Sequence, residues 1–234
     1  MTEALNALRR VAASTDHGYV ELQTIPYRAH HLLAEEALSV TRPGDRVFEG
    51  GVSSGYFARV LVESGRRVDG HELDPAAAEE ARAVCEKVHE GDLQIFDADE
   101  LDGPYQLMLF GDTLEHVPDP ASVLRRLRSQ LADDGHLVVS IPNIANWTVR
   151  LQLLFGRFRY TDRGILDRTH LRFYTVATLP EMLADAGFSV VKLQASVPVP
   201  GVTGEALARV AHRVGNLRPG FFGYNLIATC TKGS

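Results

Sequence analysis

Apolar residues occur along the chain in short runs, and the segments between these runs carry apolar positions at helical spacing. One run, Tyr105–Gly111 (YQLMLFG), has the continuous hydrophobicity of a strand that is buried on both faces. Strands are predicted on this basis at residues 46–49, 68–72, 89–92, 105–111, 136–141, 188–193 and 223–231. The alternation with helices predicts a parallel sheet covered on both faces, and the long final connection indicates a last strand inserted antiparallel.

Cap residues define several helices between these strands. Asp74-Pro75 and Asp119-Pro120 each place an acid at the N-cap and a proline at the first helical position. Asn146 is a candidate cap for a short helix at 147–155. A first helical region is predicted over residues 3–38, with breaks near 15–18 and 24–26. A later helix starts near Thr175 or Thr178 and ends at 186. The other predicted helices cover residues 54–64, 75–87, 120–134, 147–155 and 205–214. Trp147, Leu151 and Leu154 share one helix face, and so do Leu207, Val210, Ala211 and Val214.

Composition excludes several classes of protein. The chain has 234 residues, of which 45% are hydrophobic and 23% charged, as in ordinary globular domains. A net charge of −6 argues against general binding to nucleic acid or to membrane surfaces. Cys85 and Cys230 have no metal-site spacing, and we expect both to be reduced, buried thiols. The N-terminus has no apolar signal core, and no run approaches the roughly 18 apolar residues that a membrane span needs, so we expect a cytoplasmic protein.

Two acids follow the first two predicted strands. Glu49 precedes the glycine turn Gly50–Gly55, and Glu72 ends the second strand 23 residues later. Strand-end acids are often only solvated. However, a glycine turn lets the backbone approach a ligand, and open parallel sheets bind ligands where the strand order reverses. We therefore predict that both acids bind a nucleotide-like cofactor.

The motifs that follow identify the family. Glu49-Gly50-Gly51-Val52-Ser53-Ser54-Gly55 resembles the first motif of the class I S-adenosylmethionine-dependent methyltransferases, with Ser53 in place of the middle glycine. Phe110–Pro120 resembles the "LEHVPDP" segment of small-molecule O-methyltransferases, including the ubiquinone-pathway type. Gly164–Thr175 resembles a segment of methyltransferases encoded beside glycan and natural-product pathways. The resemblance covers roughly residues 40–194 and the last strand.

This resemblance implies a Rossmann-like α/β fold: a seven-stranded, mostly parallel sheet with the last strand antiparallel, helices on both faces and a small helical lid. One domain is expected, with an N-terminal helical cover (1–42), a cofactor-binding core (43–142), a lid (143–176) and the C-terminal half of the sheet (177–234). Glu72 would bind the ribose hydroxyls and Asp92 the adenine amine. The full set implied for S-adenosylmethionine is Glu49, Gly50, Gly51, Ser53, Gly55, Glu72, Leu73, Asp92, Leu93, Gly111 and Asp112.

Acids and histidines suggest the chemistry of the site. Asp112, Glu115 and His116 follow the fourth strand, and His170 precedes an aromatic-Thr sequence. This arrangement resembles the metal-binding segments of ubiquinone-pathway enzymes and of small-RNA 2′-O-methyltransferases, which implies a site for Mg²⁺ or Mn²⁺. Two alternatives stay open: His116 or His170 acts alone as a general base, or the acids are only anions near a helix start. His30, His31 and His136 are given no role.

Residues 143–176 carry six arginines against two aspartates. One interpretation is a lid that recognises an anionic acceptor, such as a phosphorylated or nucleotide-linked sugar, with Arg150, Arg168, Arg172 and Tyr160 as candidate contacts. The other is a solvated loop whose arginines pair with Asp162 and Asp167. We expect the aromatic residues of this segment to pack in the core of the lid rather than to stack on bases: Trp147, Phe155, Phe158 and Tyr160.

We therefore predict an enzyme that moves a methyl group to a hydroxyl of a small molecule, such as a sugar or natural-product intermediate, with or without a divalent metal. Transfer to nitrogen or carbon, and a non-catalytic cofactor-binding partner protein, are the alternatives. An NAD-linked oxidoreductase is disfavoured because the glycines at 50, 51 and 55 do not form Gly-x-Gly-x-x-Gly. No nucleic-acid or membrane partner is expected, and the oligomeric state stays open.

Overall fold

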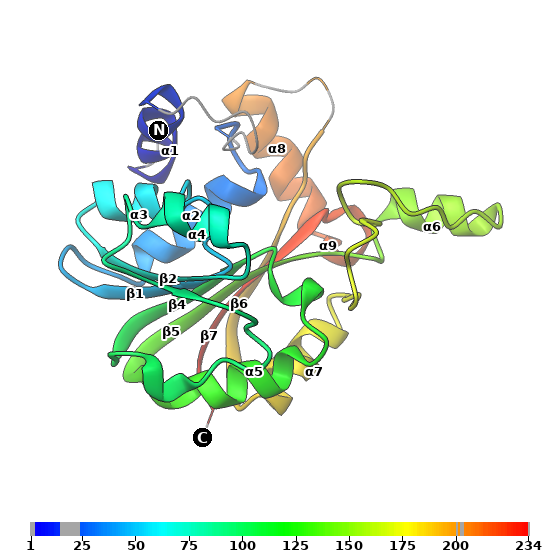
Figure 1. The fold of residues 1–234 in the computed structure, drawn as a ribbon. Coiled ribbons are helices and arrows are strands. Elements are labelled where there is room, and N and C mark those ends of the chain that lie inside the picture. The colour runs from blue at the N-terminus through cyan, green and yellow to red at the C-terminus, as the bar shows by residue number, and fades with distance from the viewer. Residues whose placement is uncertain (1–2, 15–23, 200, 202–203, 234) are drawn as a thin grey trace.

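The computed structural model describes residues 3–14, 24–199, 201 and 204–233. Seven strands form one sheet in the order β3-β2-β1-β4-β5-β7-β6 (Figure 1). Their bounds are β1 (Arg46–Gly50), β2 (Arg67–Glu72), β3 (Lys87–Glu90), β4 (Tyr105–Gly111), β5 (Leu131–Pro142), β6 (Phe188–Ser196) and β7 (Asn225–Lys232). β7 lies between β5 and β6 and is antiparallel to both, as predicted for the last strand. The fold class predicted from the sequence is confirmed.

Helices cover both faces of this sheet. The α-helices are α1 (Glu3–Ser14), α2 (Ala29–Ser39), α3 (Ala58–Glu63), α4 (Pro75–Ala81), α5 (Pro120–Leu127), α6 (Trp147–Leu154), α7 (Thr178–Asp185), α8 (Glu205–Gly215) and α9 (Pro219–Phe222). Short 3-10 helices are η1 (Ala98–Glu100), η2 (Leu114–His116) and η3 (Arg128–Gln130). In Figure 1, α1 to α4 and α8 lie on one side of the sheet and α5 and α7 on the other.

Alternation along the strands divides the core into two layers. Val47 and Leu109 pack with the layer under α1, α2 and α3, whereas their neighbours Phe48 and Phe110 pack with the layer under α5 and α7. All four side chains are fully buried. Because successive side chains of a strand point to opposite faces, the continuous apolar run of β4 supplies both layers.

The predicted caps are present. The Asp74 side chain accepts a hydrogen bond from the Ala76 N–H, and the Asp119 side chain accepts one from the Ser122 N–H. Asn146 caps α6 by accepting from the Thr148 N–H. These side chains satisfy backbone donors that the first turn of a helix leaves without a partner.

Several predicted boundaries were wrong. α3 begins at Ala58 rather than near Ser54, because the glycine turn continues to Phe57. α4 ends at Ala81 rather than near 87, because the Glu86 N–H bonds to the Val68 carbonyl and the chain joins the sheet at Lys87. Leu131 was predicted on a helix but lies in β5, paired with Tyr105. The predicted break near 24–26 is present, and the break near 15–18 lies outside the described residues.

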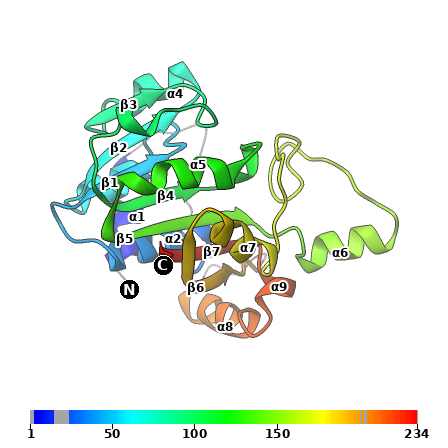
Figure 2. The same ribbon diagram turned by 90° about the horizontal axis from the view of Figure 1, so that it is seen from below.

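Two apolar helix faces are exposed instead of packed. In α6 only Val149 is buried, and Trp147, Leu151 and Leu154 are exposed. Phe155, Phe158 and Tyr160 are exposed as well, so the expected lid core is wrong for this structure. In α8 the aligned residues Leu207, Val210 and Val214 also face solvent. Figures 1 and 2 both show α6 projecting away from the sheet and its helices.

Cys85 and Cys230 are free and buried, as expected. Burial raises the pKa of each thiol to about 12, which makes both poor nucleophiles at neutral pH. Among the described residues, no helix has the length and apolar character needed to cross a membrane.

Candidate active site

The main cavity lies at the carboxyl ends of β1, β2 and β4. β1 pairs with β2 on one side and with β4 on the other, so the strand order reverses here. In open α/β sheets this is the position at which ligands bind. The cavity has a volume of about 390 Å³, within the range typical of small-molecule sites. Its lining includes nine of the predicted cofactor residues: Glu49, Gly51, Ser53, Glu72, Leu73, Asp92, Leu93, Gly111 and Asp112.

The glycine turn after β1 is held in a left-handed backbone conformation. Gly51 has a φ of 75°, and Ser53 has a φ of 51° although it carries a side chain. The Gly51 N–H donates to the His71 carbonyl, and the Ser53 N–H donates to Glu72 Oε2 at 2.7 Å. The turn after β1 is therefore tied to the end of β2.

Two predicted cofactor residues do not line the cavity. A Cβ on Gly50 would lie 2.2 Å from the Phe110 ring, and a Cβ on Gly55 would lie 3.2 Å from the backbone of Ala81 in α4. Gly55 also has a φ of 79°. Gly50 lets β1 pack closely against Phe110, and Gly55 lets the turn pack against α4. Both glycines therefore affect the shape of the cavity without lining it.

Glu49 is a buried acid in the cavity wall. Burial, and secondarily the charge of Glu72, raises its pKa to about 8. Its Oε2 atom is buried and has no hydrogen-bond partner among the described residues. Glu72 is held differently, because it also accepts hydrogen bonds from the N–H groups of Leu73 and Asp74. A cationic ligand group would satisfy the Glu49 oxygen and stabilise its charged form.

The cavity extends past β2 to Asp92 and Leu93, which follow β3. Asp92 Oδ1 accepts a hydrogen bond from the Gln94 N–H at 2.8 Å, so the carboxylate has a fixed position at the start of its loop. The exposed Leu73 and the buried Leu93 add apolar surface at this end. A planar apolar ring with a polar edge, such as adenine, suits this combination of groups.

Asp112 directly follows β4 and has a strained, left-handed backbone. Its φ is 52°, which is uncommon for a residue with a side chain. Its Oδ1 atom accepts hydrogen bonds from Ser140 Oγ of β5 and from Asn225 Nδ2 of β7, both at 2.7 Å. Strain of this kind persists where surrounding contacts determine the conformation, and it concentrates at functional sites.

Beside the cavity, Glu115, His116 and His170 bring ligand-type atoms within 4.8 Å of one another. His116 lines the cavity, and the ring centroids of the two histidines lie 4.8 Å apart. The Glu115 side chain is only 1% exposed, and neither of its oxygens has a hydrogen-bond partner among the described residues. Burial raises the pKa of this carboxyl. Asp112 was predicted as a fourth member, but it is not part of this cluster, because its carboxylate is held by Ser140 and Asn225.

Both histidines have the same tautomer, because each Nδ1 lies 3.2 Å from a carbonyl oxygen. His116 Nδ1 faces the carbonyl of Thr169, and His170 Nδ1 faces that of Ile165. A carbonyl only accepts, so each Nδ1 carries a proton, and in the neutral form of each ring Nε2 then keeps its lone pair. His170 Nε2 lies 3.9 Å from Glu115 Oε1. The three side chains thus offer two imidazole lone pairs and one carboxylate for a metal ion, and backbone carbonyls orient the rings.

Sequence reasoning missed the part of the cavity wall that comes from α2. His30 of α2 lines the cavity with Tyr56 and Phe57, and its ring lies 5.8 Å from that of Tyr56. Burial lowers the pKa of His30, while nearby Asp112 partly opposes this shift. No motif marks His30. The available signal was its place on the apolar face of a predicted helix. Thr113, His71 and Ser140 also line the cavity without having been predicted.

None of the four candidate substrate residues lines this cavity. Arg168 pairs with Asp162 at 2.6 Å, which fits the solvated-loop interpretation for this residue. Arg150 donates to the Ala145 carbonyl, and Tyr160 is exposed beside Phe158. Arg172 contacts the edge of the cavity, because its Nε donates to the carbonyl of Pro118, a cavity-lining residue.

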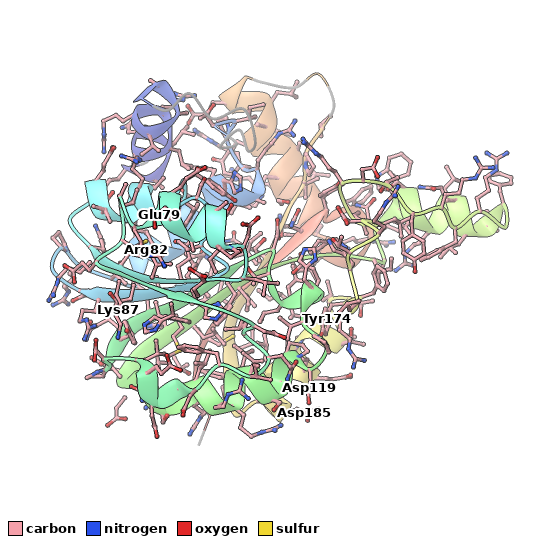
Figure 3. All side chains as sticks on the ribbon, in the orientation of Figure 1. Glu79, Arg82, Lys87, Asp119, Tyr174 and Asp185 are labelled. Atoms are coloured by element: carbon pink, nitrogen blue, oxygen red, sulfur yellow. The ribbon has the colours of Figure 1, made fainter. Side chains whose placement is uncertain are left out.

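A second, more open hollow lies on the side of α5 and α7. Its lining includes Arg172 and the residues Asp119, Tyr174 and Asp185 that Figure 3 labels. It adjoins the main cavity only through Pro118, which lines both.

Comparison with known proteins agrees with this geometry. Residues 19–193 match the family model described as a methyltransferase domain. The chain belongs to the S-adenosylmethionine-dependent methyltransferases. The matched range includes all the residues that line the cavity, and it also includes His170.

The known proteins compared with this chain share 17–35% of its residues in the matched regions. The chain is 35% identical over 96 residues to an uncharacterized protein of Mycobacterium tuberculosis. This match covers 40% of the chain but only 31% of the mycobacterial protein. The chain is 26% identical to the ubiquinone biosynthesis O-methyltransferase of Psychrobacter arcticus, over 68% of this chain and 63% of the relative. A crystal structure of magnesium protoporphyrin IX methyltransferase from Synechocystis with bound SAH has a TM-score of 0.60 at 17% identity, and covers 99% of this chain and 95% of that one.

Proposed function

We propose that this protein transfers a methyl group from S-adenosylmethionine to a hydroxyl oxygen of a small molecule of the sugar or natural-product type. The observation that carries the proposal is the position of His116, which lines the cofactor cavity and also belongs to the cluster with Glu115 and His170. This cluster supplies a proton acceptor next to the place where a methyl group would be presented. The named relative that methylates oxygen supports the same acceptor atom.

The cofactor fits the described residues. Its amino group is the cation that the orphaned Glu49 oxygen requires, its ribose hydroxyls suit Glu72, and its adenine suits Asp92 and Leu93. Among the cavity-lining residues, all of which are described, there is no lysine or arginine that would repel a sulfonium. When bound, S-adenosylmethionine supplies an electrophilic methyl group, which an acceptor oxygen takes as the carbon–sulfur bond breaks and its electron pair stays on sulfur.

The residues of the chain position the acceptor and remove its proton. His116 Nε2 would accept the hydroxyl proton, because its Nδ1 is already committed to the Thr169 carbonyl. The backbone of residues 171 and 172 holds the cluster together, since both N–H groups donate to the Glu115 carbonyl at 2.8 and 3.0 Å. Helix α2 adds His30 to the cavity wall, where it would limit the access of water to the reacting atoms.

A divalent metal is the alternative form of this proposal, in which the Nε2 lone pair of His116 binds the ion instead of accepting the proton. Glu115, His116 and His170 would hold it, and its chemistry would be to lower the proton affinity of the acceptor hydroxyl. The buried, partnerless Glu115 carboxylate fits a cation. Two imidazoles with one carboxylate suit Mn²⁺ better than Mg²⁺, which prefers oxygen ligands alone.

The experiment starts with cofactor binding. Calorimetry of the full chain should show binding of S-adenosylhomocysteine and none of NAD, and Glu72→Ala should weaken the binding by at least about tenfold because the ribose loses its acceptor. Acceptors are then screened by transfer of a labelled methyl group from the cofactor. Transfer only to amines or carbon acids would contradict the oxygen assignment, and tight binding without transfer to any acceptor class would favour a non-catalytic protein.

A further inference from the structure

The segment from Trp147 to Arg163, here called the arm, has an unusual surface for a protein of net charge −6. It carries four arginines against one aspartate, and that aspartate, Asp162, is paired with Arg168. The side chains of Leu154 and Phe155 are 76% and 68% exposed. Isolated exposed apolar residues are ordinary, but a contiguous cluster on a projecting segment indicates an interaction surface.

The arm has a defined shape. Asn146 caps the start of α6, and Gly156 ends it with a φ of 65°. The Gly156 and Arg157 N–H groups donate to the Leu153 and Gln152 carbonyls, which is the pattern of a glycine helix terminus. The apolar tip at 153–155 is therefore followed directly by the basic and aromatic residues of 157–160. Figures 1 and 2 both show this segment away from the body of the protein.

The composition of the arm favours one occupant. Most exposed side chains on the arm are apolar, aromatic or cationic, which is the composition of a peptide that lies at a membrane interface: Arg150, Leu151, Leu153, Leu154, Phe155, Arg157, Phe158, Arg159, Tyr160 and Arg163. The exposed side chains outside these classes are Gln152, Thr161 and Asp162, and Asp162 is paired with Arg168. Trp147, at the start of α6, and Tyr160 are the residue types that settle at the level of the lipid headgroups. We propose that the arm docks on a membrane surface that contains anionic lipids.

Two other occupants fit less well. In a closed dimer the same surface of each copy faces its partner, so the interface would gather the arginines of both arms with no excess of acid to offset them. A nucleic acid would use the arginines and aromatic rings, but it would leave Leu151, Leu153 and Leu154 without a role. The net charge of the whole chain argued against membranes, yet attraction to a charged surface falls off within a Debye length and so depends on local charge.

The arm also adjoins a second exposed apolar region. The Arg150 guanidinium lies 5.7 Å from the centre of the Phe221 ring in α9, and Asn146 Nδ2 donates to the Phe222 carbonyl. Phe221 and Phe222 are themselves exposed. The base of the arm is therefore held against α9.

The chain contains its own probe for this proposal, because Trp147 is its one tryptophan and is 46% exposed. The full chain is mixed with vesicles of phosphatidylcholine alone or with added phosphatidylglycerol. We expect a blue shift of tryptophan emission and co-sedimentation with the anionic vesicles, both reduced by salt. Arg157→Gln with Arg159→Gln should weaken partitioning about 25-fold, at about fivefold for each arginine.

Leu154→Ser with Phe155→Ser should abolish the blue shift while leaving the elution volume of the protein unchanged. Matched controls are Ile95→Ser, an exposed apolar residue outside the arm, and Arg10→Gln, an exposed arginine of α1. Both controls should bind like the wild type. No binding to anionic vesicles overturns the proposal. So does a dimer that the arm variants dissociate, or a fluorescence change with single-stranded RNA but not with vesicles.

Discussion

The backbone N–H of Ser53 donates a hydrogen bond to Glu72 Oε2 at 2.7 Å. This bond joins the turn after β1 to the acid that ends β2, so two motifs that are separate in the sequence form one unit. It uses the backbone of Ser53, not its hydroxyl. The serine that replaces the usual glycine therefore preserves the connection, and its cost lies in the left-handed backbone, with a φ of 51°.

Ser53→Gly should make the protein more stable. A residue with a side chain in the left-handed region costs about 1 kcal/mol, which glycine does not incur. We expect a higher melting temperature and an affinity for S-adenosylhomocysteine within about twofold of the wild type. Ser54→Gly is the matched control and should lower stability, because Ser54 is not in that region. A large loss of affinity in Ser53→Gly would instead show that the hydroxyl contacts the cofactor.

Glu49 should make the unliganded protein less stable as the pH rises. Its pKa is raised to about 8 in the folded state, so the folded state binds one proton more than the unfolded state between about pH 4.5 and 8. Its contribution is complete below that window and falls by about 1.4 kcal/mol per pH unit within it. Denaturation of wild type and Glu49→Gln across this range should show the difference, with the exposed Glu63→Gln as control.

Cofactor binding should have the opposite pH dependence. A protonated Glu49 must lose its proton before it can pair with a cationic amino group, so affinity should increase up to about pH 8 and binding should release a proton. Calorimetry in buffers of different ionisation enthalpy measures this release. The same release in Glu49→Gln would assign the proton to another group.

Gly50 should not tolerate even one added methyl group. A Cβ there would lie 2.2 Å from the fully buried Phe110 ring, so Gly50→Ala forces strain of about 1–3 kcal/mol or more. Adding Phe110→Leu removes the ring and should recover part of the loss. A double-mutant cycle by urea denaturation gives the coupling energy between positions 50 and 110. If the two changes are additive, the clash with the ring does not cause the loss of stability in Gly50→Ala.

The sequence predicts elements best where one local signal decides. β4 was predicted with its observed bounds, because a strand that is buried on both faces must be apolar throughout. The caps at Asp74, Asp119 and Asn146 follow from backbone donors that need an acceptor. Glu49 and Glu72, which the sequence singles out at the ends of two strands, both line the cavity, because the topology brings the ends of parallel strands together.

Long-range contacts account for most of the differences. Leu131 fits a helical stripe, but its pairing with Tyr105 places it in β5. The pattern of α6 and α8 is that of buried faces, and periodicity alone does not tell whether a partner surface exists in the same chain. His30 was missed because the cover helix meets the cavity only in the folded protein. Asp112 was grouped with Glu115 by its spacing, whereas β5 and β7 hold its carboxylate away from that cluster.

Substitutions in the cluster of Glu115, His116 and His170 should distinguish metal chemistry from general-base chemistry. If Glu115, His116 and His170 hold a metal, Glu115→Gln and His170→Asn should abolish Mn²⁺ binding measured by electron paramagnetic resonance and leave S-adenosylhomocysteine binding intact. Chelation should then stop methyl transfer and Mn²⁺ should restore it.

If His116 acts alone, its change to asparagine should lower kcat by about 10²–10⁴-fold, and chelation should have no effect. His136→Asn, at a histidine outside the cavity lining, is the control in both cases. Loss of cofactor binding in the cluster variants would show instead that the cluster shapes the cavity.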